Sequence, residues 1–133
     1  MSRTAPPIRA TTFSMRGTVA QLNDRLLAVL GGQSPMVRLS GETAHKQAER
    51  HPDVKSNDYD RIQDVVDQGL VVRQGERTLV FVAETEAEQW WRLVVKRTAD
   101  GRETYLVAFH RIKPNQVRST ARRGEVVRHG KDG

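Results

Sequence analysis

The sequence predicts an α+β domain in which N-terminal helices pack on one face of an antiparallel sheet of about four strands. Two patterns support this prediction: three segments with helical spacing of apolar residues come first, and four segments of strand-like composition follow them. The chain has 133 residues, a length that suits one compact domain and is too short for two. We therefore expect a single core between one helical layer and one sheet.

Each predicted helix has recognisable ends. The three segments are residues 17–30, 40–50 and 58–68. The first ends at the pair Gly31-Gly32 and the third at Gly69, because glycine favours the position that follows a helix. Ser40 suits the N-cap of the second helix, where its hydroxyl accepts a hydrogen bond from the first turn. Pro52 ends that helix, since it forces the preceding residue out of helical dihedral angles.

The four predicted strands are residues 70–73, 78–82, 90–97 and 103–111, and the last two form a hairpin. Two registers are open for this hairpin. A two-residue Asp-Gly turn pairs Lys96 with Tyr105, and a three-residue loop over residues 99–101 pairs Lys96 with Thr104. The three-residue loop gathers the apolar side chains on one face. Burial of that face favours this second register, and we expect it.

In the expected register the two faces of the hairpin differ in character. The buried face carries Trp91, Leu93, Val95, Tyr105, Val107 and Phe109. The other face carries Arg92, Lys96, Thr104, Ala108 and His110, interrupted by Val94 and Leu106. His51, just beyond a helix end, can approach this polar face from the helical layer. We therefore expect the chemistry of the protein to lie there.

Positive charge is concentrated toward the C-terminal end. The formal net charge is +6, and residues 111–133 hold seven Lys or Arg against two acidic residues. We interpret residues 1–16 as an extended leader, 17–112 as the folded domain and 113–133 as a basic arm that is weakly ordered or mobile. A basic chain favours a polyanionic partner such as RNA. The alternative is a solvated terminus with no partner.

Features that the sequence lacks exclude several kinds of site. It has no cysteine, so disulfides, thiolate metal sites and cysteine nucleophiles are excluded together. No run of 18 apolar residues is present, and no apolar segment follows the first arginines, so we expect neither a membrane span nor a secretory signal peptide. His45 and His51 lack the spacing of paired zinc ligands, and there is no phosphate-binding glycine loop or nucleophile elbow. We therefore expect no metal and no cofactor.

The polar hairpin face and His51 together suit metal-free cleavage of RNA. In that reaction a base removes the 2′-hydroxyl proton, an acid protonates the leaving 5′-oxygen, and cations stabilise charge on the phosphoryl oxygens. His51 and His110 can divide the acid and base roles, because the ordinary pKa of imidazole is about 6.5. Arg92 and Lys96 would hold the phosphate, and the product would carry a 2′,3′-cyclic phosphate.

Further side chains suit RNA binding. Trp90 can stack on a base at the rim of the sheet, and Thr104 adds a hydroxyl. The tail supplies guanidinium groups for the backbone phosphates at Arg118, Arg122 and Arg123. All these residue types also have ordinary structural explanations. The histidines can pack as a half-exposed strand residue and a helix-terminal residue, and the cations can simply solvate an exposed sheet face.

Several short motifs resemble a known family. The stretches His45-Lys46, His51-Pro52-Asp53 and Tyr59-Asp60 resemble a helical motif of phage-associated nuclease domains. The segments 91–96 and 104–111 resemble the closing hairpin of the same domains. Over residues 37–112 the chain therefore resembles the phage-associated branch of the barnase–EndoU–colicin–RelE-like ribonuclease superfamily.

The resemblance implies a barnase/RelE-like fold, with a helical layer against a four-stranded antiparallel sheet, and metal-independent endoribonuclease activity. It implies that Lys46 and His51 act from a helix, that Lys96 acts from a strand, and that His110 and Arg111 close the site. Related domains occur beside phage head-morphogenesis proteins and among polymorphic toxins, which implies a toxin or a phage or mobile-element effector. Its substrate would be RNA, with tRNA a candidate, and an acidic immunity or antitoxin protein could neutralise it. It would act in the cytoplasm of the producing or target cell, or be carried in a virion.

One position departs from the pattern of that family. Where the family is expected to have a serine or threonine two residues before the last-strand histidine, this chain has Ala108. Thr104 is a candidate substitute for the missing hydroxyl. The alternative is a non-catalytic RNA-binding or virion-associated module on the same fold.

Overall fold

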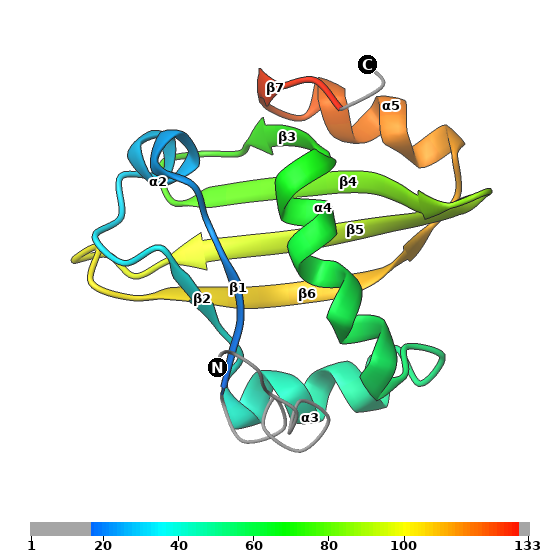
Figure 1. Ribbon diagram of the computed structural model, residues 1–133. Coiled ribbons are helices and arrows are strands. Elements are labelled where there is room, and N and C mark those ends of the chain that lie inside the picture. Colours follow the sequence, from blue (N-terminus) through cyan, green and yellow to red (C-terminus); the bar gives the residue numbers. More distant parts are fainter. Residues whose placement is uncertain (1–16, 131–133) are drawn as a thin grey trace, which may run out of the picture.

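Three strands of nine residues each form the centre of the sheet in the computed structural model, which describes residues 17–130 (Figure 1). They are β4 (Thr78–Glu86), β5 (Gln89–Arg97) and β6 (Thr104–Ile112), and consecutive strands are antiparallel. Four short strands extend the sheet: β1 (Thr18–Gln21), β2 (Met36–Arg38), β3 (Leu70–Arg73) and β7 (Glu125–Arg128). The order across the sheet is β1-β2-β6-β5-β4-β3-β7.

The expected sheet of about four antiparallel strands is wrong, because the sheet has seven strands and is mixed. β2 pairs with β6 in the parallel direction, and β7 forms an edge beside β3. The three unexpected strands, β1, β2 and β7, hold only three or four residues each. Segments this short show no clear alternation, and pairing with neighbouring strands decides their conformation. The barnase/RelE-like architecture implied by the resemblance is therefore corrected as well.

Side chains cap the first turns of α2 and α3. The α-helices are α2 (Asp24–Leu30), α3 (Gly41–Arg50), α4 (Ile62–Gln68) and α5 (Asn115–Arg122), and the 3₁₀ helix η2 (Ser56–Arg61) precedes α4. α3 confirms its prediction, because the Ser40 hydroxyl accepts a hydrogen bond from the Thr43 N–H and His51 is the C-cap. α2 is shorter than predicted, because Asn23 caps it and the residues before Asn23 enter β1 and the turn that follows.

One face of the sheet carries the main core. Its fully buried side chains are Leu26, Leu30, Ile62, Val65 and Val66 from the helices and Phe81, Trp91, Leu93, Val95 and Phe109 from the sheet. α4 runs across this face in Figure 1 and contacts β1, β4 and β5. The Trp91 ring stacks on the Phe109 ring with centroids 4.6 Å apart. Burial of this apolar layer is the main source of stability.

The opposite face, which we call the second face, is only partly covered. Val72 and Val80 pair on it, and both are fully buried although they lie outside the main core. α5 leads from the end of β6 to β7, beside β3. The turn after α5 lies so close to the sheet that a Cβ on Gly124 would collide with the backbone oxygen of Arg73. Over β6 the second face is more open, and Val107 is 46% exposed there.

Much of the basic C-terminal segment belongs to the fold. Residues 115–128, expected to lie in a weakly ordered arm, include α5 and β7. Arg128 donates to the carbonyl oxygen of Gly69 at 3.0 Å and to that of Val66 at 2.5 Å, at the end of α4. The negative end of the helix dipole favours a cation at this position. The expected leader, residues 1–16, lies outside the described residues.

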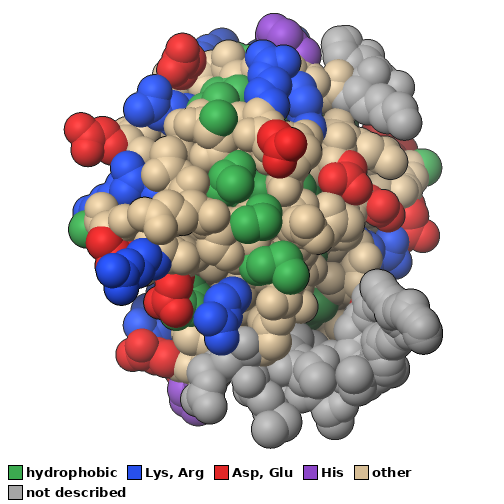
Figure 2. Space-filling model, turned by 60° about the vertical axis from the view of Figure 1, so that its left-hand side comes forward, with side chains coloured by type: hydrophobic (Ala, Val, Ile, Leu, Met, Phe, Trp, Pro, Cys, Tyr) green, Lys and Arg blue, Asp and Glu red, His purple; other side chains and the backbone are tan. Residues whose placement is uncertain are grey.

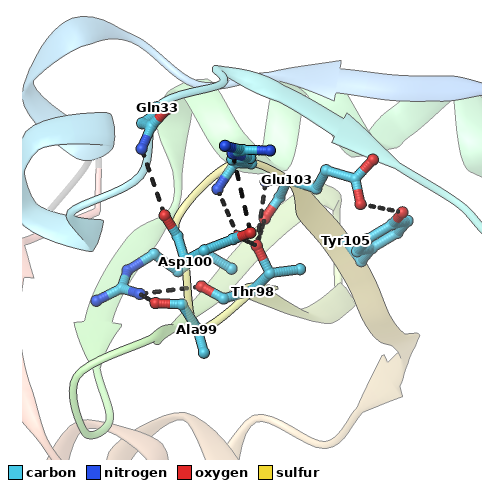
Figure 3. Close-up of polar contacts among 8 residues, drawn as sticks. Gln33, Thr98, Ala99, Asp100, Glu103 and Tyr105 are labelled. Atoms are coloured by element: carbon cyan, nitrogen blue, oxygen red, sulfur yellow. Dashed lines mark hydrogen bonds and ion pairs between the residues drawn. The ribbon is translucent and has the colours of Figure 1, made fainter.

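The register expected for the β5–β6 hairpin is wrong. Lys96 pairs with Tyr105 rather than with Thr104, and a bulge then shifts the pairing by one residue. The connecting loop is held by its own polar groups: the Thr98 hydroxyl donates to the Asp100 carboxylate at 2.7 Å (Figure 3). A longer contact of 3.3 Å joins the Gln33 amide to the backbone oxygen of Asp100.

This register moves side chains between the two faces. Thr104 and Leu106 were expected on the polar face, but both are buried on the core side. The Thr104 hydroxyl donates to the carbonyl oxygen of Ser34 at 3.3 Å. Tyr105 and Val107 were expected in the core, but they lie outside it. The bulge puts one extra residue on β6, so apolar side chains on either side of it reach the core, which strict alternation cannot predict.

Candidate functional site

A side chain of α3 closes the free edge of β6. β2 pairs only with Thr104 and Tyr105, so the remainder of β6 has no described strand beside it on that edge. Gln47 takes the place of a strand: its Nε2 donates to the carbonyl oxygen of Phe109 at 2.7 Å, and the Phe109 N–H donates to Gln47 Oε1 at 3.1 Å. Both residues are buried. These two bonds hold the end of α3, and therefore His51, against β6.

His51 and His110 meet at this edge. Their ring centroids lie 4.6 Å apart, and the ring planes are 14° from parallel. His110 Nδ1 lies 3.0 Å from the carbonyl oxygen of Arg111. Because a carbonyl only accepts, this hydrogen bond places a proton on Nδ1. Nε2 is then the atom of the His110 ring that can exchange a proton with a ligand.

The surroundings of the pair favour an uncharged His51. Burial is the largest cause that lowers the pKa of His51, and the adjacent His110 lowers it further. Arg50 acts in the same direction, whereas the Asp53 carboxylate raises the pKa. An uncharged imidazole is the form that accepts a proton. His51 therefore has the character of a general base.

Arg111 links β6 to the loop that follows His51. Its guanidinium carbon lies 4.8 Å from the centre of the Trp91 ring, where a cation is favoured. Its nitrogens lie 3.6 Å from a carboxylate oxygen of Asp53 and 3.9 Å from one of Asp58, which is buried. The charge of Arg111 is thus balanced by two carboxylates. This arrangement gives Arg111 a positioning role.

The charge of Arg92 is not balanced by a carboxylate among the described residues. It pairs with His110 across the two strands and lies on the second face. Burial lowers the pKa of the Arg92 guanidinium, and the positive charge of Arg123 lowers it further. The Nε atom of Arg92 is buried without a hydrogen-bond partner. Within residues 17–130, neither Arg92 nor Arg123 forms an ion pair. An anion is therefore favoured here.

Other predicted site residues lie elsewhere. Lys96 is four residues along β5 from Arg92, roughly 13 Å at the usual rise of a strand. Thr104 lies at that same end of the hairpin and is buried. Lys46 is on the exposed surface of α3, with its Nζ 3.9 Å from a carboxylate oxygen of Glu42. Lys96 and Thr104 are thus away from the histidine pair.

The predicted RNA-binding residues are divided between the hairpin and α5. Trp90 pairs with Ile112 at the histidine end of the hairpin and is partly buried. Arg118 and Arg122 lie on α5 and Arg123 follows the helix as its C-cap, and all three are exposed. Only Arg123 of these three interacts electrostatically with Arg92 in the part of the chain that the structure describes.

Sequence reasoning missed two residues that build the site, Gln47 and Asp58. Both are polar and buried. Neither stands out in the sequence, because Gln47 lies in a helix of mostly polar residues and Asp58 has other acidic residues close to it along the chain. The one available signal is spacing: Gln47 lies three residues after Ala44, which packs against the core, so both share one helix face.

A separate cavity of about 730 Å³ lies at the opposite end of the hairpin from the histidines, between α2 and β7. Figure 2 shows a nearby face on which hydrophobic side chains are bordered by charges of both signs. The three arginines that line the cavity already have partners. Arg25 and Arg97 donate to the carbonyl oxygens of Val127 and Leu30, at 3.4 and 2.7 Å. Arg73 lies 3.7 Å from the Glu125 carboxylate. This cavity therefore offers less for an anion than Arg92 does.

Two observations concern residues 17–130 only. The described helices are all too short to cross a membrane. No three His, Asp or Glu side chains there are grouped so that they could hold a metal ion.

Comparison with known proteins adds no relative. No protein-family model, curated protein or solved structure matches the chain. The resemblance to the barnase–EndoU–colicin–RelE-like superfamily therefore stays a prediction.

Proposed function

We propose that this protein is a small metal-independent ribonuclease, which cleaves RNA by attack of a 2′-hydroxyl on the adjacent phosphorus. The observation that carries the proposal is the contact between His51 and His110, whose ring centroids lie 4.6 Å apart at the edge of β6. Two imidazoles at one point can supply both the base and the acid of this reaction.

The different surroundings of the two rings divide the roles. His51, whose pKa is lowered, removes the 2′-hydroxyl proton. His110 in its cationic form donates a proton from Nε2 to the leaving 5′-oxygen, while Nδ1 stays bonded to the Arg111 carbonyl. The bond from phosphorus to the 5′-oxygen breaks as the bond to the 2′-oxygen forms. The products are a 2′,3′-cyclic phosphate and a free 5′-hydroxyl.

The stacking limits how RNA can approach the site. Nearly parallel rings with centroids 4.6 Å apart leave no space for a phosphate between them. The RNA strand therefore meets the two rings at their edges. Arg92, which pairs with His110 on the second face, is placed to stabilise negative charge on the phosphoryl oxygens.

The proposal rests on this site and not on the fold. Such an enzyme fits a toxin or a phage or mobile-element effector, acting in the cytoplasm of the producing or target cell or carried in a virion. Its substrate is RNA, with tRNA a candidate. The net charge of +6 favours an acidic immunity or antitoxin protein as a partner, because opposite charges steer association.

The direct test is cleavage of total tRNA and of a labelled RNA strand in excess EDTA. Wild-type protein should release fragments with 2′,3′-cyclic phosphate ends, and His51→Ala should lose this activity. His45→Ala is the matched control, because His45 is exposed on the same helix and contacts Glu49 at 3.4 Å. Inactivity of the wild type on every RNA, or equal activity of His51→Ala, would refute the proposal.

A second candidate function is RNA binding without cleavage. It is favoured by Ala108, which offers no hydroxyl, and by the distance of Lys96 from the histidine pair. Under this alternative, wild type and His51→Ala bind RNA equally and neither cleaves it. The two candidates therefore differ in the EDTA experiment, while both predict binding that weakens as salt is raised.

A further inference from the structure

Arg92 stands apart from other arginines that pack against this fold. Arg97 and Arg128 bond to carbonyl oxygens, and Arg73 and Arg111 lie beside carboxylates. The Arg73 Nε–H is also buried without an acceptor, but its guanidinium is paired with Glu125. Arg92 is partly buried, yet it has none of these partners among the described residues. Its Nε–H is withdrawn from water and donates to nothing, which costs free energy unless an acceptor is supplied.

The neighbourhood of Arg92 adds a second cation instead of a counter-charge. Arg123, the C-cap of α5, is close enough for its charge to disfavour the charged form of Arg92. The turn after Arg123 is held against the sheet, since Gly124 has no room for a side chain beside Arg73 and Val72. The packing of this turn therefore keeps Arg123 beside the sheet, near enough to act electrostatically on Arg92.

A bound anion would supply an acceptor for the Arg92 Nε–H and would also offset the repulsion between the charges of Arg92 and Arg123. A phosphate has several oxygens, so it can accept the Nε–H of Arg92 and lie against Arg123 at the same time. The planar fork of a guanidinium matches two phosphate oxygens, which makes phosphate a better occupant than a simple halide. His110 lies beside Arg92 in the strand pairing, so a phosphate held there would be next to the histidine pair.

We propose that Arg92 and Arg123 form a phosphate-binding subsite between β5 and the end of α5, which holds a backbone phosphate of the RNA strand beside His110. The choice of RNA as the source of that phosphate rests on the proposed function. The subsite makes α5 a part of the active surface. It also separates the roles of neighbouring arginines, because Arg123 belongs to the subsite whereas Arg118 and Arg122 contribute only long-range charge.

The test follows the side-chain ¹⁵Nε–Hε signal of Arg92 by NMR while inorganic phosphate is added. The signal should shift in a saturable way. Arg123→Ala should weaken phosphate binding about tenfold, as expected for one charge-assisted hydrogen bond. Arg122→Ala removes the same charge from the adjacent residue and should change the affinity less than about threefold, because Arg122 would act on the phosphate only through screened long-range charge. Arg92→Lys keeps a positive charge without the fork and should weaken binding nearly as much as Arg123→Ala. This variant lacks the Arg92 side-chain signal, so its phosphate affinity is measured by calorimetry beside that of the wild type.

The same variants are then tested with a DNA oligonucleotide, which has backbone phosphates but no 2′-hydroxyl to cleave. Competition by this strand for the Arg92 signal, weakened by Arg123→Ala, supports a backbone phosphate as the occupant. If phosphate shifts the signal but the strand does not compete, the subsite serves a small phosphate ligand and the RNA assignment is wrong. An unshifted Arg92 signal, or equal losses in Arg122→Ala and Arg123→Ala, would overturn the subsite.

These results are independent of cleavage. Inorganic phosphate and the DNA strand are not cleaved, and His45→Ala, which changes an exposed residue of α3, should leave the affinity for both unchanged. Binding without cleavage by the wild type would leave the subsite standing and remove the ribonuclease proposal. Cleavage without a response of Arg92 would do the reverse.

Discussion

Arg92 and Arg111 lie in the same hairpin, on opposite faces of the sheet, and they have opposite electrostatic surroundings. Arg111 lies over the Trp91 ring, between the carboxylates of Asp53 and Asp58. Arg92 is partly buried beside another cation, with an unpaired Nε–H. A balanced charge of this kind stabilises the fold, whereas an unbalanced one costs stability. The contrast supports a structural role for Arg111 and the proposed binding of a phosphate on the second face.

The largest expected effect is on the cleavage rate, and it comes from substitution of His110 on the second face. His110→Ala should lower the cleavage rate by about 10²- to 10⁴-fold, the usual contribution of a general acid. Initial rates on a labelled RNA strand in EDTA measure this loss. An unchanged rate, with the variant folded by circular dichroism, would break the assignment of function to this face.

The attachment of α3 to β6 should give the next largest effect, and it acts on stability. Gln47→Ala leaves the N–H and C=O of Phe109 without partners in a buried place, and should lower the free energy of unfolding by about 2–4 kcal/mol. Gln63→Ala is a close control, because Gln63 bonds the N–H and C=O of Gln21 in the same way at an exposed position. Water replaces those bonds, so the cost should be below about 1 kcal/mol.

Urea unfolding of Gln47→Ala and Gln63→Ala measures the difference. Equal losses in the two variants would show that the edge of β6 is not a buried attachment point. His51 would then lack the support that brings it to His110.

Substitution of Arg111 should lower the free energy of unfolding, whereas substitution of Arg92 should not. Arg111→Ala removes the cation over the Trp91 ring and one of two arginines beside the buried Asp58, which keeps Arg61 at 3.5 Å, and it should lower the free energy of unfolding by about 1–2 kcal/mol. Arg92→Leu removes a cation that has no partner and should leave the stability unchanged or raise it. Urea denaturation of both variants gives the comparison. A loss from Arg92→Leu as large as that from Arg111→Ala would contradict the contrast.

The smallest effect is the dependence of stability on pH. The folded-state pKa of His51 lies below its ordinary value of 6.5. Between the two values the unfolded state binds more protons, so stability is full above about pH 6.5 and falls as the pH drops toward the folded-state pKa. His51→Ala should be less sensitive to this fall than His45→Ala. Thermal unfolding at several pH values checks this, and equal slopes would count against it.

The sequence predicted the parts of the fold that have strong local signals. The cap at Ser40 and the stop at Pro52 located α3, and the long apolar strands located the centre of the sheet. It did not reveal β1, β2 or β7, because strands of three or four residues depend on the neighbours that they pair with.

The candidate site was predictable only in part. The approach of His51 to His110 was predicted, and the two rings are in contact. The grouping of Lys96 and Thr104 with them failed, because a bulge in β6 moved Thr104 to the core side and strand length separates Lys96 from the pair. The partners that decide the charge balance, Asp58 for Arg111 and Arg123 for Arg92, are distant in sequence. Only the packing of the loop and of α5 reveals them.

The central claim is that His51 and His110 cleave RNA without a metal. The most direct measurement is the formation of 2′,3′-cyclic phosphate ends on a labelled RNA strand in excess EDTA, by wild type, His51→Ala and His45→Ala. Wild type and His45→Ala should form these ends at similar rates, and His51→Ala should lose about 10²-fold or more of the activity. Cleavage that stops in EDTA, or that His51→Ala retains in full, would contradict the central claim.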